Sequence, residues 1–193
     1  MPVLFLDFET TGLNIYHDDI IEYSIREKDT GFSVSSLVKL DKQDKVSNFI
    51  TGLTGISNEM LVDGQTPQEA VTSMVNFIDA HSSRKEKATL VAHNGDSFDF
   101  LLLKKLMNKH SVHPRYNLQY LDTLRFVQKL TSRFYRYNQP NLCKIFKIKN
   151  NAEHRASGDT ESLEEIYNNL AKMYSTKTST IGEHIKYTYD CIK

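Results

Sequence analysis

A short apolar run close to the N-terminus is the feature that most constrains the fold. Residues 3–8 read Val-Leu-Phe-Leu-Asp-Phe, nearly all apolar and strand-forming, and Thr10-Thr11-Gly12 ends the run soon afterwards. An apolar run of this length without alternation is typical of a strand covered on both faces. We therefore predict a central strand within a layered α/β domain.

The rest of the sequence passes between strand and helix patterns. Residues 20–26 and 32–40 are further strand candidates, and Asp29-Thr30-Gly31 between them is typical of a hairpin turn. Thr66-Pro67-Gln68-Glu69 is a capping box that starts a helix. The later candidates are a strand over 88–92, a helix over 98–107, a strand over 120–123, a helix ending near 130 and a last helix from near 159. We predict a mixed sheet, antiparallel at one edge and parallel at the other, flanked by helices.

Length and composition bound the class of protein. A chain of 193 residues fits one domain with a full core, which we assign to residues 1–175, followed by a loosely patterned tail at 176–193. Lys plus Arg equals Asp plus Glu at 24 each, so any contact with nucleic acid is local rather than a broad basic surface. Two cysteines are too few for a disulfide framework or a cysteine zinc site. With no basic leader and no long apolar segment, we expect a soluble intracellular protein of the cytoplasm or nucleus without a membrane partner.

Two acids stand at the end of the first strand. Asp7 and Glu9 are two residues apart, so the period of a strand points both carboxylates to the same face. Open α/β sheets bind ligands at the carboxyl ends of their strands. Two adjacent like charges require a cation or a raised pKa. Taken alone, the spacing also fits a solvated strand end.

Three further residues could join these acids. Asp99 begins the helix after the strand that ends at Ala92, and Asp159 begins the last helix. Either aspartate also fits an ordinary helix cap. His154 lies in a loop just before Asp159, after residues 150–153, which look mobile. We expect Asp122 to cap or orient the helix that follows it, and the residues after Ala92 to brace the site.

The five residues form an ordered constellation that resembles a known family. The three motifs are Phe5-Leu6-Asp7-Phe8-Glu9-Thr10-Thr11-Gly12-Leu13, Ala92-His93-Asn94-Gly95-Asp96-Ser97-Phe98-Asp99-Phe100 and His154-Arg155-Ala156-Ser157-Gly158-Asp159. They resemble the motifs of the DnaQ-like exonucleases of the DEDDh group, which have a ribonuclease H-like fold. The resemblance implies a ribonuclease H-like five-stranded mixed sheet. The second motif and residues 53–57 are most similar to the three-prime repair exonuclease (TREX) branch.

This resemblance implies a reaction and a cofactor. It implies a 3′→5′ exonuclease that releases nucleoside 5′-monophosphates from nucleic-acid 3′ ends by a two-metal mechanism, with single-stranded DNA favoured. Two Mg²⁺ or Mn²⁺ ions would be held by Asp7, Glu9, Asp99 and Asp159, since hard cations prefer carboxylate oxygens. His154 would be the general base, because imidazole titrates close to neutral pH.

The same resemblance points to residues that would hold the strand end. Backbone donors around Thr10 would meet the terminal 3′-hydroxyl, and Leu13 and Leu53 would wedge against the terminal base. Phe98 offers a stacking face. Apolar contacts ignore base identity, so we expect weak sequence preference. Leu13 and Leu53 also fit ordinary core positions.

A second candidate contact lies in residues 129–137, which interleave cations with aromatic residues. Arg133 and Arg136 could contact phosphates while the neighbouring rings contact bases. A solvated basic end of a helix explains the same pattern.

Other functions fit the sequence as well. Exoribonucleases of the ribonuclease T type carry the same five residues, and a polymerase proofreading subunit would use the same chemistry. DNA is favoured over RNA only through the second motif. An inactive nucleic-acid-binding scaffold would be expected to lose an acid, and all five residues are present. Similarity to TREX proteins implies a possible homodimer.

Overall fold

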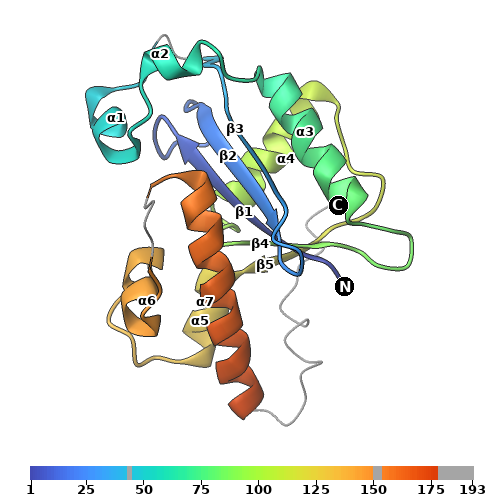
Figure 1. Cartoon of the computed structure of the whole chain (residues 1–193), viewed down its shortest axis with the longest axis vertical. Coiled ribbons are helices and arrows are strands. Elements are labelled where there is room, and N and C mark those ends of the chain that lie inside the picture. The colour runs from blue at the N-terminus through green and yellow to red at the C-terminus, as the bar shows by residue number, and fades with distance from the viewer. Residues whose placement is uncertain (43–44, 150–153, 178–193) are drawn as a thin grey trace.

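The fold is centred on one mixed sheet. The computed structural model describes residues 1–42, 45–149 and 154–177 (Figure 1). Within these residues the strands form a five-stranded sheet in the order β3-β2-β1-β4-β5. The strands are β1 (Val3–Thr10), β2 (Ile20–Glu27), β3 (Ser33–Leu37), β4 (Thr89–Ala92) and β5 (Gln119–Asp122). The pairs β1–β2 and β2–β3 are antiparallel, whereas β1–β4 and β4–β5 are parallel. The predicted fold class is confirmed, with the apolar first strand at the centre.

The third strand is shorter than the predicted range of 32–40. It ends at Leu37, and Val38 forms an isolated parallel bridge with Gln65. The Lys39 amide donates to the Gln65 carbonyl at 2.8 Å, and the Gln65 amide donates to the Leu37 carbonyl at 2.9 Å. The Val38 amide still donates to the Ile21 carbonyl of β2 at 2.9 Å, so the chain changes its pairing partner from β2 to the segment around Gln65 here.

Helices cover both faces of the sheet. Successive side chains of β1 point alternately to the helices on one face and to those on the other. Leu4, Leu6 and Phe8 pack with α3 (Pro67–Ala80) and α4 (Asp99–His110). Phe5 points to the opposite face. That face is covered by α5 (Thr123–Leu130), α6 (Gln139–Phe146) and α7 (Ala156–Lys177) (Figure 1). The sheet is therefore buried on both sides, as the apolar run predicted.

Two short helices near the ends of β1 and β2 were not predicted (Figure 1). They are α1 (Asn48–Thr54) and α2 (Asn58–Leu61), and their buried side chains pack on Ile21 of β2. Local signals for α1 are present in the sequence: Ser47 accepts a hydrogen bond from the Ile50 amide, and Gly55 takes a left-handed φ of 72° after the helix. The helix α6 was missed too, although Pro140 marks its first turn.

The other helix boundaries follow their caps. The capping box at Thr66 is present in full. The last helix begins at Ala156, three residues before the predicted start at Asp159. The predicted boundary at 175/176 falls within α7, and residues 178–193 of the predicted tail lie outside the described residues. In the part of the chain that the structure describes, no helix has the length and apolar character needed to cross a membrane.

Candidate active site

Asp7 and Glu9 lie on the face of β1 that meets α7. They continue the alternation of Phe5 and stand opposite Ser24 and Glu22 of β2. The pairing between β1 and β4 reaches only as far as Phe5, so the last residues of β1 are open on the β4 side. The predicted shared face is confirmed, at the crevice where the order of strand connections reverses.

Asp99 reaches this crevice from the start of α4. It is the first residue of the helix and only 4% exposed, and its carboxylate accepts a hydrogen bond from the Phe8 amide in the open part of β1. The preceding loop packs closely, because a Cβ at Gly95 would lie 2.6 Å from the Phe100 ring. Glycine at this position allows the tight turn that carries Asp99 to the end of β1.

Asp122 braces the same loop, as well as capping α5 as predicted. Its carboxylate accepts hydrogen bonds from the amides of Leu124 at 2.8 Å, Asn94 at 3.0 Å and Asp96 at 3.2 Å. His93 was also predicted to brace the site. Its Nδ1 lies 2.9 Å from Oγ1 of Thr123, the first residue of α5. These buried bonds connect β5 to the loop before Asp99.

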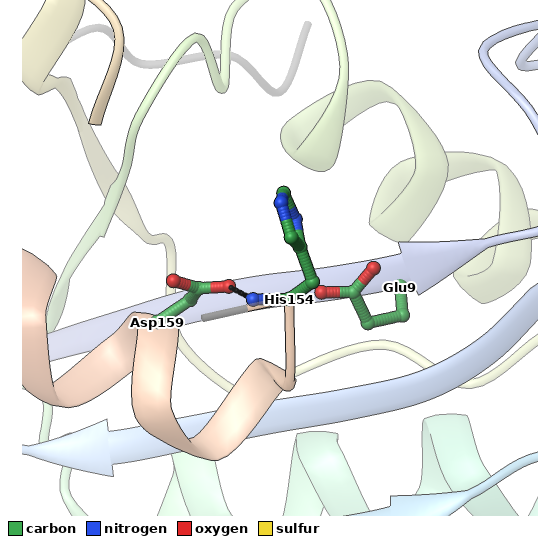
Figure 2. Close-up of side chains that lie close together, drawn as sticks. All are labelled: Glu9, His154 and Asp159. Carbon is green, nitrogen blue, oxygen red and sulfur yellow. Dashed lines mark hydrogen bonds between the residues drawn. The ribbon is translucent and has the colours of Figure 1, made fainter. Parts of the chain in front are cut away.

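Asp159 lies in the first turn of α7, and His154 lies in the turn just before that helix. The His154 amide donates to Oδ2 of Asp159 at 3.0 Å (Figure 2). One possible ligand atom from each of Glu9, His154 and Asp159 lies within 4.8 Å of the other two. The predicted mobile residues 150–153 lie outside the described residues. The structure thus brings Glu9 of the first motif together with His154 and Asp159 of the third.

A fifth carboxylate at the site was not predicted. Glu22 of β2 is 5% exposed and binds the Arg155 guanidinium, with Nη2 to Oε1 at 2.6 Å and Nε to Oε2 at 3.1 Å. The sequence does contain a signal for this contact, since Glu22 follows two apolar residues in a predicted strand. Acidic side chains are rarely buried without a partner.

Gln139 was also missed. Its Nε2 donates to the Asp159 carbonyl at 2.9 Å and lies 3.4 Å from Oδ1 of the same residue. A further bond joins it to Oγ of Ser162 at 2.9 Å. The start of α6 is therefore anchored to the first turn of α7 beside the carboxylate.

The carboxylates disturb one another's ionisation. Burial raises the pKa of Asp7 well above its ordinary value, and the negative charges of Asp99, Asp159, Glu9 and Glu22 raise it further. Burial, followed by the charges of Asp159 and Glu22, raises the pKa of Glu9 from 4.5 to about 8, although Arg155 opposes this. Burial raises the pKa of Asp99 to about 7. The site concentrates negative charge that a cation would stabilise.

The raised pKa of Glu9, caused first by burial and then by the neighbouring charges, predicts a pH-dependent stability in the absence of metal. Glu9 is ionised above a pKa near 4.5 in the unfolded chain but keeps its proton up to about pH 8 in the folded one, so folding is progressively destabilised as pH rises through that window. In EDTA, Glu9→Gln is expected to melt about 5 °C or more above the wild type at pH 8. The difference in melting temperature between the two proteins should disappear near pH 4. Thermal unfolding followed by circular dichroism measures it, and an equal difference at both pH values would contradict the assignment.

The residues predicted to hold the strand end occupy different environments. Leu13 is 86% exposed and Leu53 is 42% exposed, so neither is a core leucine. Thr10 is buried and its hydroxyl donates to the Gly12 carbonyl at 2.6 Å. Phe98 is partly buried and packs against the core beneath α4. Their contact with substrate stays a prediction.

The basic and aromatic stretch divides between core and solvent. Phe134 and Tyr137 pack against the core under α7, whereas Arg133 and Arg136 are exposed. Tyr135 is 92% exposed, and the Arg136 guanidinium lies 5.6 Å from the centroid of its ring. The two arginines thus remain available for the contact predicted for them.

Comparison with known proteins places this geometry in a family. Residues 4–167 match the family model described as Exonuclease. The chain belongs to the exonuclease family. The match covers all three motifs, so the DnaQ-like DEDDh assignment is confirmed. The similarities found do not bear on the TREX branch in particular, which stays a prediction.

The curated relatives of this exonuclease domain are large polymerases. It is 32% identical over 166 residues to a DNA polymerase III PolC-type of Mycoplasma genitalium, covering 83% of the chain and 11% of the relative. It is 29% identical over 194 residues to the protein of the same name from Thermotoga petrophila, covering 96% and 13%. The chain therefore spans little more than a tenth of these relatives.

Solved structures share the fold. The complex of E. coli exonuclease I with a dT13 oligonucleotide superposes with a TM-score of 0.75 at 14% identity, over 91% of this chain and 42% of that one. A zinc-bound complex of the same enzyme with single-stranded DNA gives a TM-score of 0.74 at 13% identity, over 95% and 42%. At this identity the likeness concerns the fold alone.

Proposed function

We propose that this chain is a metal-dependent 3′→5′ exonuclease that shortens single-stranded nucleic acid and releases nucleoside 5′-monophosphates. The observation that carries the proposal is the convergence of four carboxylates and one imidazole at the carboxyl end of the sheet. They come from three segments far apart in the sequence: Asp7 and Glu9, then Asp99, then His154 and Asp159. Membership of the exonuclease family supports the same reaction.

The donor set suits two divalent cations, Mg²⁺ or Mn²⁺. Arg155 neutralises Glu22, which leaves the four predicted ligands with a net charge of −4 when they are ionised. Two divalent cations balance that charge, and carboxylate oxygens are the ligands that these hard cations prefer. The charges of all the other carboxylates raise the pKa of Asp7, which supports the role that the resemblance implies for it, a ligand that both cations would share.

The bound cations would activate water and stabilise charge on the leaving oxygen. The side chains account for the rest. His154 accepts the proton of the attacking water, whose oxygen forms the new bond to phosphorus. The bond from phosphorus to the 3′ oxygen of the preceding nucleotide breaks, and that oxygen takes a proton from solvent. The preceding nucleotide therefore keeps a 3′-hydroxyl, and the released one keeps its 5′-phosphate. Asp159 holds the His154 backbone during this step.

Exposed apolar side chains near the site suit a terminal base without regard to its identity. Leu13 and Leu53 flank the base, the Thr10 backbone meets the 3′-hydroxyl and Phe98 offers a stacking face. Arg133 and Arg136 contact phosphates further along the strand. DNA is favoured as the substrate because the relatives are named as DNA polymerases and exonuclease I is seen with dT13 and dA16.

Polymerase proofreading is the second candidate, favoured by the PolC-type relatives. In that case the same site would remove mispaired 3′ ends in association with a polymerase. The exoribonuclease and inactive-scaffold readings stay open to the test below. The predicted homodimer and intracellular location stay predictions.

The test is a time course on matched single-stranded DNA and RNA labelled at the 5′ end. With Mg²⁺ or Mn²⁺ we expect a ladder that shortens from the 3′ end, faster on DNA than on RNA, and no shortening in EDTA. A duplex with a mispaired 3′ end, shortened faster than its paired counterpart, would favour proofreading. Faster cleavage of RNA would replace the DNA assignment. Binding without cleavage of either strand would overturn the proposal in favour of a scaffold.

A further inference from the structure

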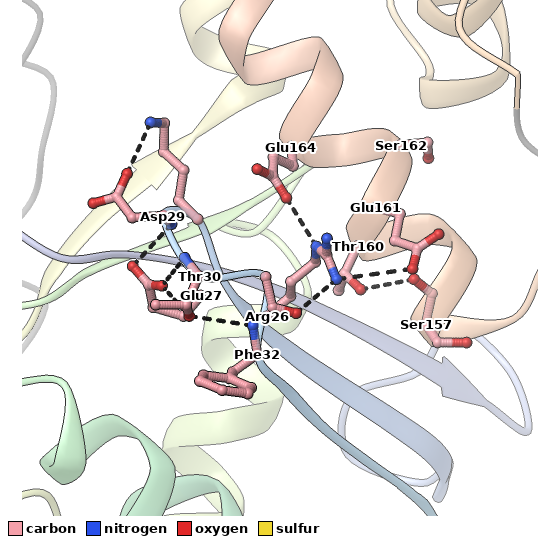
Figure 3. Close-up of polar contacts among 12 residues, drawn as sticks. Arg26, Glu27, Asp29, Thr30, Phe32, Ser157, Thr160, Glu161, Ser162 and Glu164 are labelled. Carbon is pink, nitrogen blue, oxygen red and sulfur yellow. Dashed lines mark hydrogen bonds and ion pairs between the residues drawn. The ribbon is translucent and has the colours of Figure 1, made fainter.

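The contact between β2 and α7 is polar where an apolar contact would be ordinary. Tyr23 and Ile25 of β2 face α3 and α4, so the alternate side chains Glu22, Ser24 and Arg26 face α7. Each of the three has a polar partner on or just before that helix. Figure 3 shows the contact furthest from the site, that of Arg26 with Glu161 and Glu164.

The two outer contacts dock the body of the helix. Oγ of Ser24 lies 3.0 Å from Oγ1 of Thr160. Nε of Arg26 donates to Oε2 of Glu164 at 2.8 Å, and its Nη1 lies 3.8 Å from Oε1 of Glu161 (Figure 3). These partners lie beyond Asp159 in the helix, so the two contacts hold α7 against the sheet through residues other than His154, Arg155 and Asp159.

The innermost contact is of a different kind. The Glu22 carboxylate takes three hydrogen-bond contacts from Arg155, between 2.6 and 3.2 Å. It also accepts the amide of Ala156 at 2.9 Å. Ala156 is the first residue of α7, where amides have no partner within the helix. Glu22 therefore caps α7 from a neighbouring strand and at the same time fixes the direction of Arg155.

His154 depends on this arrangement through its backbone. Its φ is +63°, in the left-handed region, which is disfavoured for a residue with a Cβ. Two contacts flank that conformation: the His154 amide is bound by Asp159, and the next residue, Arg155, is bound by Glu22. If Arg155 were released, His154 could relax to a negative φ, and its ring would leave the neighbourhood of Glu9.

We propose that Glu22 and Arg155 are a positioning pair that holds His154 and Asp159 in their working geometry. The proposal rests on the proposed function. Glu22 is buried but the Arg155 side chain is 39% exposed, and an ion pair of this kind contributes little to stability. Its bidentate geometry, however, fixes direction in a way that an apolar contact or a lysine cannot.

The interface supplies a matched control. Arg155→Lys and Arg26→Lys make the same change at two contacts of one β2–α7 interface. With Mg²⁺ at saturation, Arg155→Lys is expected to lose about 10- to 100-fold in kcat, whereas Arg26→Lys should stay within about threefold. Glu22→Gln, which keeps the shape but loses the charge, should match Arg155→Lys. If Glu22→Gln does not fold, the two lysine variants still decide.

Two readouts separate positioning from a structural role. If the pair acts through His154, Arg155→Lys should cost little further kcat in a His154→Ala background, because the base is already gone. Calorimetry with Mn²⁺ alone should give an affinity about tenfold lower for Arg155→Lys than for Arg26→Lys. Wild-type kcat and Mn²⁺ affinity in Arg155→Lys, or full multiplication of the two kcat losses together with an unchanged Mn²⁺ affinity, would overturn the proposal.

The Mn²⁺ measurement also separates this proposal from the proposed function. Should the wild type cleave neither DNA nor RNA, the exonuclease assignment fails while Mn²⁺ affinity can still be compared. A lower Mn²⁺ affinity in Arg155→Lys than in Arg26→Lys then supports positioning of Asp159, and equal affinities overturn it.

Discussion

Asp7→Asn is expected to slow metal-dependent strand shortening by about 10³-fold or more while leaving the fold intact. Asp7 interacts with all four other carboxylates of the site, so its loss affects both proposed cations. Asparagine has the same shape but carries no charge, and a neutral amide is a weaker ligand for a hard cation. Single-turnover cleavage of 5′-labelled single-stranded DNA measures the effect.

The control for this variant is a carboxylate far from the site. Asp29→Asn lies in the turn between β2 and β3, where the side chain is mostly exposed, and should stay within about twofold of wild-type activity. In EDTA at pH 8, Asp7→Asn should also melt above the wild type, because it removes a buried carboxylate whose pKa is raised. Activity within about tenfold of the wild type would remove Asp7 from the centre of the mechanism.

His154→Ala is expected to lower kcat by about 10²- to 10⁴-fold, the usual contribution of a general base. Because the carboxylates remain, Mn²⁺ affinity measured by calorimetry should fall by less than about tenfold. Added imidazole should restore part of the rate. The matched control is His113→Ala, an exposed histidine beyond the far end of α4.

The same measurements distinguish the two chemical roles open to His154. Its ring nitrogen lies close enough to Glu9 and Asp159 to serve as a metal ligand. A collapse of Mn²⁺ affinity, with no rescue by imidazole, would identify a ligand in place of a base. Wild-type kcat in His154→Ala would exclude both roles.

Local periodicity predicted where the acids lie in the fold, and the resemblance of the three motifs was needed to interpret them as a site. Asp7 and Glu9 share a face because strand side chains alternate, and the run before them is apolar enough to require a central strand. Asp99 follows β4, which pairs with β1 in parallel, and parallel strands bring their carboxyl ends to one edge. These inferences need only short stretches of sequence.

Contacts between distant segments could not be predicted in this way. Glu22 and Arg155 are 133 positions apart. The local sequence around either residue does not indicate that the two form an ion pair. The short helices α1 and α2 have 7 and 4 residues, too few for a helical period to stand out from a loop. The exposure of Leu13 and Leu53 depends on how those segments dock, which propensity does not determine.

The order of the segments along the chain has a consequence for synthesis. The carboxylates of β1 and the start of α4 are made well before α7, which carries the last aspartate and the histidine. Until α7 docks on β2, a growing chain holds only part of the constellation and lacks the arginine that neutralises Glu22. Because domains fold as units during translation, the constellation is complete only after α7 has been made and has docked on β2.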